Sequence, residues 1–172
     1  MKWAGITIIF LSCSGGGIWA SLILEKRKRQ ISTLRRAILF LNREIDYRLT
    51  PLSEAFLAVG NSCEKPWDSF FLHMGETLGK EMEEGKDFSF LLSEAVENAI
   101  KFHPWKEDLS FLKSSLLSLG QLDKQMQLSS LKLLEEALAE AEQKAETERQ
   151  QKGKLYRTLG LCFGFLLALM CL

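Results

Sequence analysis

The sequence is poor in the residues that build chemical sites. Its 172 residues include only two histidines and four cysteines. His73 and His103 are far apart in the chain, and no two cysteines form a C-x-x-C pair, so neither a metal site nor a disulfide framework is indicated. The glutamates and serines form no nucleophile–base–orienter set, and no glycine–lysine pair has the surrounding pattern of a phosphate loop. We therefore expect no enzyme, no metal and no cofactor.

An excess of positive charge is also absent, since 22 basic residues balance 22 acidic ones. A chain without such an excess is a poor candidate for nucleic-acid binding, which depends on neutralising phosphates. The charges are unevenly placed, however. Every acidic residue, and every basic residue except Lys2, lies between Glu25 and Arg157. Both ends of the chain are therefore almost free of charge.

The segment Trp3–Leu24 contains 22 residues without a charge. As a helix it would be about 33 Å long, which matches the hydrocarbon core of a bilayer. A cleaved signal peptide would have a shorter apolar stretch and a small-x-small site. A lipoprotein would be processed at Cys13, but the apolar run continues past that residue. We favour an uncleaved transmembrane helix over residues 1–24.

The second uncharged segment, Thr158–Leu172, has 15 residues, and extending it back to Leu155 gives a helix of about 27 Å. Tyr156 and Arg157 suit the membrane interface, because the ring fits headgroup depth and the guanidinium reaches outward. We predict a transmembrane helix over residues 155–172. A re-entrant segment is the alternative.

Basic residues flank both segments on their inner sides. Lys26–Arg29 follow the first segment, and Lys152, Lys154 and Arg157 lie at the second. The positive-inside rule therefore places the domain between them, residues 25–154, in the cytoplasm.

The middle of the chain shows the helical period and no sustained alternation of period two. The sequence therefore predicts an all-α protein, with a cytoplasmic antiparallel bundle of about six helices between two transmembrane helices. Apolar stripes at spacings of three and four mark the first and last long helices. These stripes are Ile31, Leu34, Ile38, Leu41 and Ile45, and Leu131, Leu134, Leu138, Ala141 and Ala145.

Shorter helices are predicted between these two. Thr50 is expected as the N-cap of the second helix with Pro51 at its first position, and Gly60-Asn61 as its end. Pro66 is expected to start a third helix. A fourth begins near Asp87, and a fifth carries leucines from Leu109 to Leu119 before a stop at Gly120.

Six glutamates, from Glu135 to Glu148, line the outer faces of the last helix. A charge run of this kind is usually a solvated face. If the first and last helices are antiparallel neighbours, however, these acids would lie beside the basic stretch Lys26–Arg36. Such pairs would fix the register of the helices while each contributes only about 0–1 kcal/mol.

Small residues at a spacing of four occur in both uncharged segments. Gly160 and Gly164 share one face of the second segment, and Gly16 and Ala20 share one face of the first. This spacing favours close packing of helices in lipid. The two pairs are expected to pack against each other within one chain, or to form a homo-oligomer.

Several short motifs, taken in order, resemble the stage III sporulation protein AB family. They are T-P-L-x-E-A at Thr50–Ala55, Ser93-Glu94-Ala95, Leu119-Gly120-x-x-Asp123-x-x-x-Gln127, and Tyr156-Arg157-x-Leu159-Gly160. The resemblance covers essentially the full length. Val96 departs from the family pattern, since many members have tryptophan at this position. The difference affects packing and not the resemblance itself.

The resemblance implies a component of the channel complex between mother cell and forespore, located in the mother-cell membrane that faces the forespore. It also implies a cytoplasmic part similar to the F-type platform domain of type II secretion machines. Such a domain would dock a secretion-type ATPase and contact other channel subunits. The alternative from the residues alone is a membrane-anchored coiled-coil adaptor or sensor, unrelated to secretion, whose acidic helix binds a basic partner.

Overall fold

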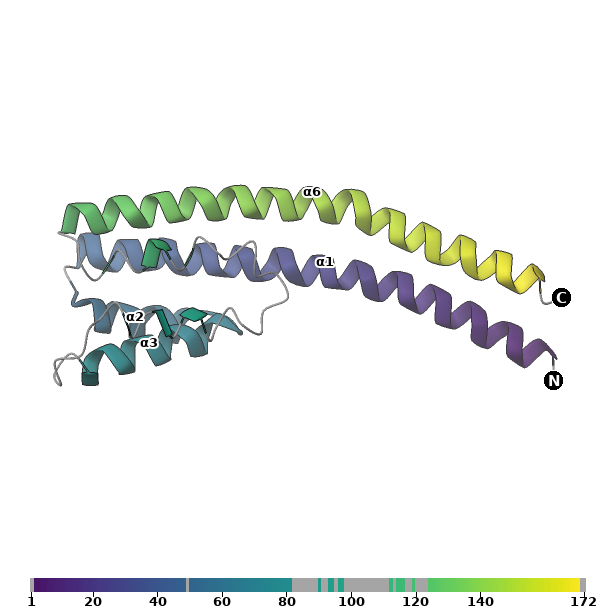
Figure 1. Ribbon diagram of the computed structural model, residues 1–172, viewed down its shortest axis with the longest axis horizontal. Coiled ribbons are helices and arrows are strands. Elements are labelled where there is room, and N and C mark those ends of the chain that lie inside the picture. The colour runs from purple at the N-terminus through teal and green to yellow at the C-terminus, as the bar shows by residue number, and fades with distance from the viewer. Residues whose placement is uncertain are drawn as a thin grey trace. The chain divides into compact units, whose positions relative to one another are not determined.

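The computed structural model describes residues 2–48, 50–81, 90, 93–94, 96–97, 112, 114–116, 119 and 124–170. These residues contain helices and no strand, which confirms the all-α class (Figure 1). Four helices have defined bounds: α1 (Lys2–Tyr47), α2 (Leu52–Ser62), α3 (Trp67–Glu81) and α6 (Lys124–Met170). Over this described part of the chain, no helix combines the length and the apolar composition needed to cross a membrane.

The predicted fourth and fifth helices lie largely outside the described residues. Their described members that are buried are Val96, Leu112, Leu116 and Leu119. The family departure at Val96 therefore falls at a fully buried position, which agrees with a packing role. The predicted first and last helices correspond to α1 and α6, and both continue without a break into the uncharged segments.

The chain divides into two compact units. The terminal unit comprises Met1–Arg29 and Glu142–Leu172, and the central unit comprises Gln30–Ala141. α1 and α6 each contribute residues to both units, whereas α2 and α3 lie wholly in the central one. The division into transmembrane helices over 1–24 and 155–172 and a cytoplasmic domain over 25–154, which follows from the charge distribution, stays a prediction.

The core of the central unit uses the apolar stripes that the sequence predicts. All five predicted positions of the α1 stripe are at most 5% exposed, and Leu131, Leu134 and Leu138 of α6 are at most 1% exposed. Residues at spacings of three and four lie on one side of a helix, so each stripe buries a single continuous face. Ala141, the last α6 stripe member in this unit, is only half-buried.

α2 and α3 pack against each other through two glycine–leucine contacts. A Cβ at Gly60 would lie 2.7 Å from the backbone nitrogen of Leu72, and one at Gly75 would lie 2.9 Å from that of Leu57. Glycine is required at both positions because the facing backbone is too close for any side chain. Gly60 therefore lies inside α2, which continues to Ser62, so the predicted end at Gly60-Asn61 is wrong.

Aromatic rings fill the space around these two helices. Phe56 of α2 and Phe71 of α3 stack with centroids 6.0 Å apart, and Phe70 meets Phe71 edge-on at 5.1 Å. Trp67 is 2% exposed, and its indole N–H donates to the carbonyl oxygen of Gln30 on α1 at 2.9 Å. A buried indole needs such an acceptor, so this hydrogen bond fixes the start of α3 against α1.

Candidate functional site: the glycine contact, the charged collar and two turns

In the terminal unit, α1 and α6 meet at a contact between glycines. A Cβ at Gly17 would lie 2.6 Å from the backbone oxygen of Tyr156 and 3.3 Å from the Cα of Gly160. One turn further along α1, Ser21 lies opposite Gly153, with 3.4 Å between its Oγ and a Cβ built at Gly153. Residue numbers rise along one helix as they fall along the other, so the helices are antiparallel here.

The predicted packing residues are only partly brought together. Gly160 lies in the contact, but among the described residues a Cβ at Gly16 would meet nothing within 4 Å. The contacting glycine is Gly17, because a shift of one residue turns a side chain about 100° around the helix. Ala20 is half-buried. Gly164 lies in α6, but its surroundings are outside what the structure describes.

Sequence reasoning missed Gly153, which is buried against Ser21. Its spacing of seven from Gly160 was a usable signal, since residues two turns apart share a helix face. A search limited to the spacing of four could not find it. The glycine contact therefore extends further toward the charged residues than the sequence indicated.

A charged collar, formed by Arg27, Lys28, Glu146, Glu148 and Arg149, adjoins this contact. Arg27 Nη1 lies 2.6 Å from Glu148 Oε2, and Lys28 Nζ lies 3.7 Å from Glu146 Oε2. Both pairs join α1 to α6, as expected if the two helices are antiparallel neighbours. The collar therefore fixes the register of the helices, while each partly exposed pair contributes little stability.

A pair of the same kind lies in the central unit. There, Arg35 Nη2 lies 3.6 Å from Glu135 Oε1. Three of the six glutamates of the predicted acidic face are thus paired with basic residues of α1. Glu135, Glu146 and Glu148 thus lie beside basic residues of α1, as the alternative interpretation of the run predicts, whereas Glu136 and Glu140 are exposed.

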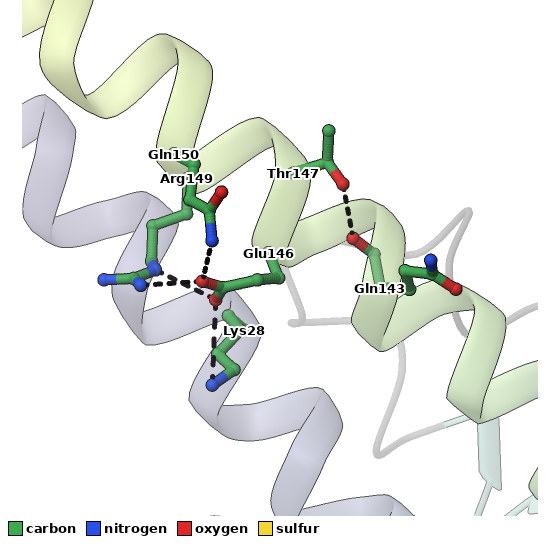
Figure 2. A network of polar contacts seen from close by, with 6 residues as sticks. All are labelled: Lys28, Gln143, Glu146, Thr147, Arg149 and Gln150. Carbon is green, nitrogen blue, oxygen red and sulfur yellow. Dashed lines mark hydrogen bonds and ion pairs between the residues drawn. The ribbon is translucent and has the colours of Figure 1, made fainter.

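Glu146 is the centre of a polar network on α6 (Figure 2). Arg149 donates from Nε and Nη2 to its two oxygens at 3.0 and 2.7 Å, and Gln150 donates to Oε1 at 2.8 Å. These hydrogen bonds lower the pKa of Glu146 from its ordinary value of 4.5 to about 2, with the Arg149 bond as the largest cause. The Lys152 hydrogen bond, at 3.1 Å, likewise lowers the pKa of Glu148.

We expect the Glu146 carboxyl to titrate with a midpoint near 2 and Arg149→Gln to move that midpoint toward 4.5. The carboxylate form carries the network, so its stabilising effect is complete above pH 4.5 and fades as the pH falls toward 2. Carboxyl NMR of the full-length protein measures this midpoint. Lys28→Gln is the control, because Lys28 is the weakest of the causes; an equal shift in both variants would contradict the assignment.

Thr50 and Pro51 lie at the turn between α1 and α2, but not in the predicted roles. Thr50 Oγ1 donates to the carbonyl oxygen of Glu44 at 3.0 Å, and no side chain caps α2. The residue before α2 is Pro51, whose carbonyl accepts from the Ala55 N–H at 3.0 Å. Thr50 follows closely on the end of α1, and its hydroxyl shares the Glu44 carbonyl with the Arg48 N–H, which donates to it at 3.3 Å.

The third of the family motifs joins α6 to the segment that precedes it. Gln127 Nε2 donates to the carbonyl oxygen of Leu119 at 2.7 Å, and Leu119 is fully buried. The amide thus ties the first turn of α6 to the segment that precedes it. Gly120 and Asp123, which belong to the same motif, lie outside the described residues. Of the described motif positions, Thr50, Leu119 and Gln127 thus take part in hydrogen bonds to the backbone.

A cavity of about 230 Å³ in the central unit contains the Cys63 thiol, with Thr33, Arg36 and Glu64 among its lining residues. Burial, and then the charge of Asp68, raises the pKa of Cys63 to about 11. The thiol is therefore protonated at neutral pH, and the thiolate is the nucleophilic form. Within the described part of the chain, no three His, Cys, Asp or Glu residues are grouped to hold a metal ion.

Comparison with known proteins agrees with the resemblance. The family model of stage III sporulation protein AB matches residues 2–172. The stage III sporulation protein AB of Bacillus subtilis (strain 168) is 27% identical over 170 residues, which cover 99% of this chain and 98% of that protein. No solved structure gives a significant match. Since the family model spans nearly the whole chain, the protein belongs to the stage III sporulation protein AB family, a family of sporulation proteins.

Proposed function

We propose that this protein is a non-enzymatic membrane platform of the channel complex between mother cell and forespore. Both ends of the chain cross the mother-cell membrane, and residues 25–154 form the cytoplasmic platform. The platform docks a secretion-type ATPase and contacts other channel subunits.

The observation that carries the membrane location is the arrangement of side chains in the terminal unit. Glycines occupy the contact between α1 and α6, whereas large apolar side chains face outward. Those that are at least half exposed include Ile18, Trp19, Leu22, Leu155, Leu159, Phe163, Phe165 and Leu166. In water this arrangement is unfavourable, because soluble proteins rarely expose apolar patches of this extent. In lipid it is expected, since small residues let helices approach closely and apolar chains contact the acyl chains.

The proposed orientation in the membrane rests on the basic residues beside the two uncharged segments. The basic residues next to the uncharged segments all lie on the side of the central unit, apart from Lys2 at the chain start. By the positive-inside rule, the central unit is cytoplasmic. A platform tethered through both α1 and α6 would keep a docked ATPase close to the bilayer.

A topology test needs a reporter other than Cys63, whose raised pKa makes it slow to react with maleimides. Asn61 is exposed on α2. We expect Asn61→Cys, in a chain lacking the native cysteines, to be labelled by an impermeant maleimide only after the cells are permeabilised. Labelling in intact cells would place the central unit outside and overturn the platform model.

The docking proposal is tested with the full-length protein in membranes. We expect the secretion-type ATPase of a spore-forming host to co-purify with it, and the association to survive washing with detergent. If the ATPase is not retained by the full-length protein while the protein stays in the membrane fraction, docking is wrong and the membrane location stands.

The adaptor hypothesis makes a different prediction. A basic partner held by the acidic face of α6 would dissociate at high salt, because exposed charges are screened beyond about 10 Å at 0.1 M. The structure favours this hypothesis less, since Glu135, Glu146 and Glu148 already pair with α1. Partner binding that is lost on replacing only Glu136 and Glu140 would revive it.

A further inference from the structure

The terminal unit contains a cavity of about 160 Å³ at the junction of its charged and uncharged parts. Its lining residues are Ser21 and Glu25 of α1 and Arg149, Gln150, Gly153 and Lys154 of α6. Ser21 belongs to the uncharged segment, whereas Glu25 is the first charged residue after it. On α6, Lys154 directly precedes Leu155, where the apolar run begins. The cavity therefore lies at the polar border of both apolar segments.

Charged and polar side chains line the cavity, and Glu146, which does not line it, pairs with the Arg149 guanidinium. Two cations, Arg149 and Lys154, face one acid, Glu25, and Gln150 and Ser21 add an amide and a hydroxyl. Glu146 orients the Arg149 guanidinium through two of its five N–H donors. The outer end of the guanidinium points away from Glu146 (Figure 2). A fixed guanidinium beside an ammonium is a suitable site for a phosphate group.

Exposed apolar side chains lie close to this cavity in the sequence of both helices. Trp19 is 68% exposed and Leu22 is 53% exposed on α1, next to Ser21. On α6, Leu155 is 56% exposed and Tyr156 is 40% exposed, next to Lys154. A free phosphate gains nothing from these neighbours, whereas a phospholipid would place its acyl chains on them. The surroundings therefore match a lipid better than a soluble anion.

We propose that this cavity binds the headgroup of one glycerophospholipid, with the phosphate at Arg149 and Lys154. The hydroxyl or amine end of the headgroup lies toward Glu25. The bound lipid fills the junction where α1 and α6 enter the membrane and keeps the charged collar at headgroup depth. This inference rests on the proposed membrane location and adds a specific lipid site to it.

The test compares two single-charge variants of α6 in the full-length protein. Lys154→Gln removes a cation from the cavity, and Lys144→Gln removes another exposed cation of α6 that does not line it. Each protein is purified in detergent with phosphatidylglycerol, and retained lipid is counted by native mass spectrometry. We expect one lipid per wild-type chain, unchanged retention in Lys144→Gln and about tenfold weaker retention in Lys154→Gln. Lys154→Arg should restore retention, and circular dichroism verifies that all variants are folded.

The remaining outcomes distinguish this inference from the proposed function. Equal lipid loss in both glutamine variants would indicate general charge attraction and overturn the site. Displacement of the lipid by millimolar inorganic phosphate or glycerophosphate would identify a free anion as the ligand and overturn the lipid assignment. A protein that fractionates with the membrane but retains no lipid overturns only this inference. A wild-type protein absent from the membrane fraction overturns the proposed function as well.

Discussion

Replacing Gly17 with leucine is expected to separate α1 from α6 in the terminal unit. Even the first atom of a side chain there would lie 2.6 Å from the backbone oxygen of Tyr156, and the backbone of an α-helix cannot move aside locally. Overpacking typically costs about 1–3 kcal/mol, and a leucine against backbone belongs at or above the upper end. Unfolding of the full-length protein by added SDS in mixed micelles measures the loss.

Gly16→Leu is the matched control, since it adds the same side chain one residue earlier in α1. Among the described residues, a Cβ at Gly16 would meet nothing within 4 Å, so we expect little change in the unfolding midpoint. The pair of variants thus separates the helix contact from a general effect of leucine in this segment. Equal midpoints for Gly16→Leu and Gly17→Leu would show that the glycine contact does not hold the helices together.

Functionally, the Gly17 variant also tests whether the paired helices matter for assembly. If the platform is held through both helices, Gly17→Leu should lower recovery of the channel complex from sporulating cells. The central unit should stay folded, because its core residues lie within Gln30–Ala141 and Gly17 does not. If the unfolding midpoint is lowered but the complex is recovered normally, assembly of the complex does not depend on the pairing of α1 with α6.

Phe71→Ala is expected to cause the largest loss of stability in the central unit. The Phe71 ring is fully buried and touches both Phe56 and Phe70. Replacing such a ring with alanine lowers the free energy of unfolding by about 3–5 kcal/mol, because the loss of buried apolar surface adds to the cost of the cavity left behind. Since typical domains are stable by about 5–15 kcal/mol, this is a large fraction of the total.

Thermal unfolding followed by circular dichroism measures this effect. We expect the midpoint of Phe71→Ala to fall by roughly 10 °C. Phe90→Ala makes the same change where the ring is 66% exposed, and it should leave the midpoint nearly unchanged. A small effect at both positions would mean that α2 and α3 are not packed as the structure shows.

The fold class and the buried faces could be predicted because they depend on local periodicity. The α1 stripe from Ile31 to Ile45 and the α6 stripe residues Leu131, Leu134 and Leu138 are buried as their spacing predicts. Pro66 directly precedes α3, as expected of the residue that starts this helix. Each of these features is encoded within a few turns of one helix.

The roles of single polar and small residues were predicted less well. Thr50 was expected to cap α2, but its hydroxyl bonds the Glu44 carbonyl of the preceding helix. Gly60 was expected to end α2, but it lies within the helix, and its lack of a side chain lets Leu72 of α3 pack closely against it. In both cases the sequence alone leaves two roles open: one toward the residue's own helix and one toward a neighbouring helix. The choice depends on which backbone lies closer in three dimensions.

The sequence by itself determined the helical class, the faces that the long helices bury and the two uncharged ends, because periodicity and charge can be read along one chain. Only the tertiary structure decided that Gly17 rather than Gly16 meets Gly160, and which glutamates of α6 pair with which cations of α1. The physical reason is that these contacts depend on the rotation and register of two helices more than a hundred residues apart. A turn of 100° or a slip of one residue changes every partner, while the periodic pattern of each helix stays the same.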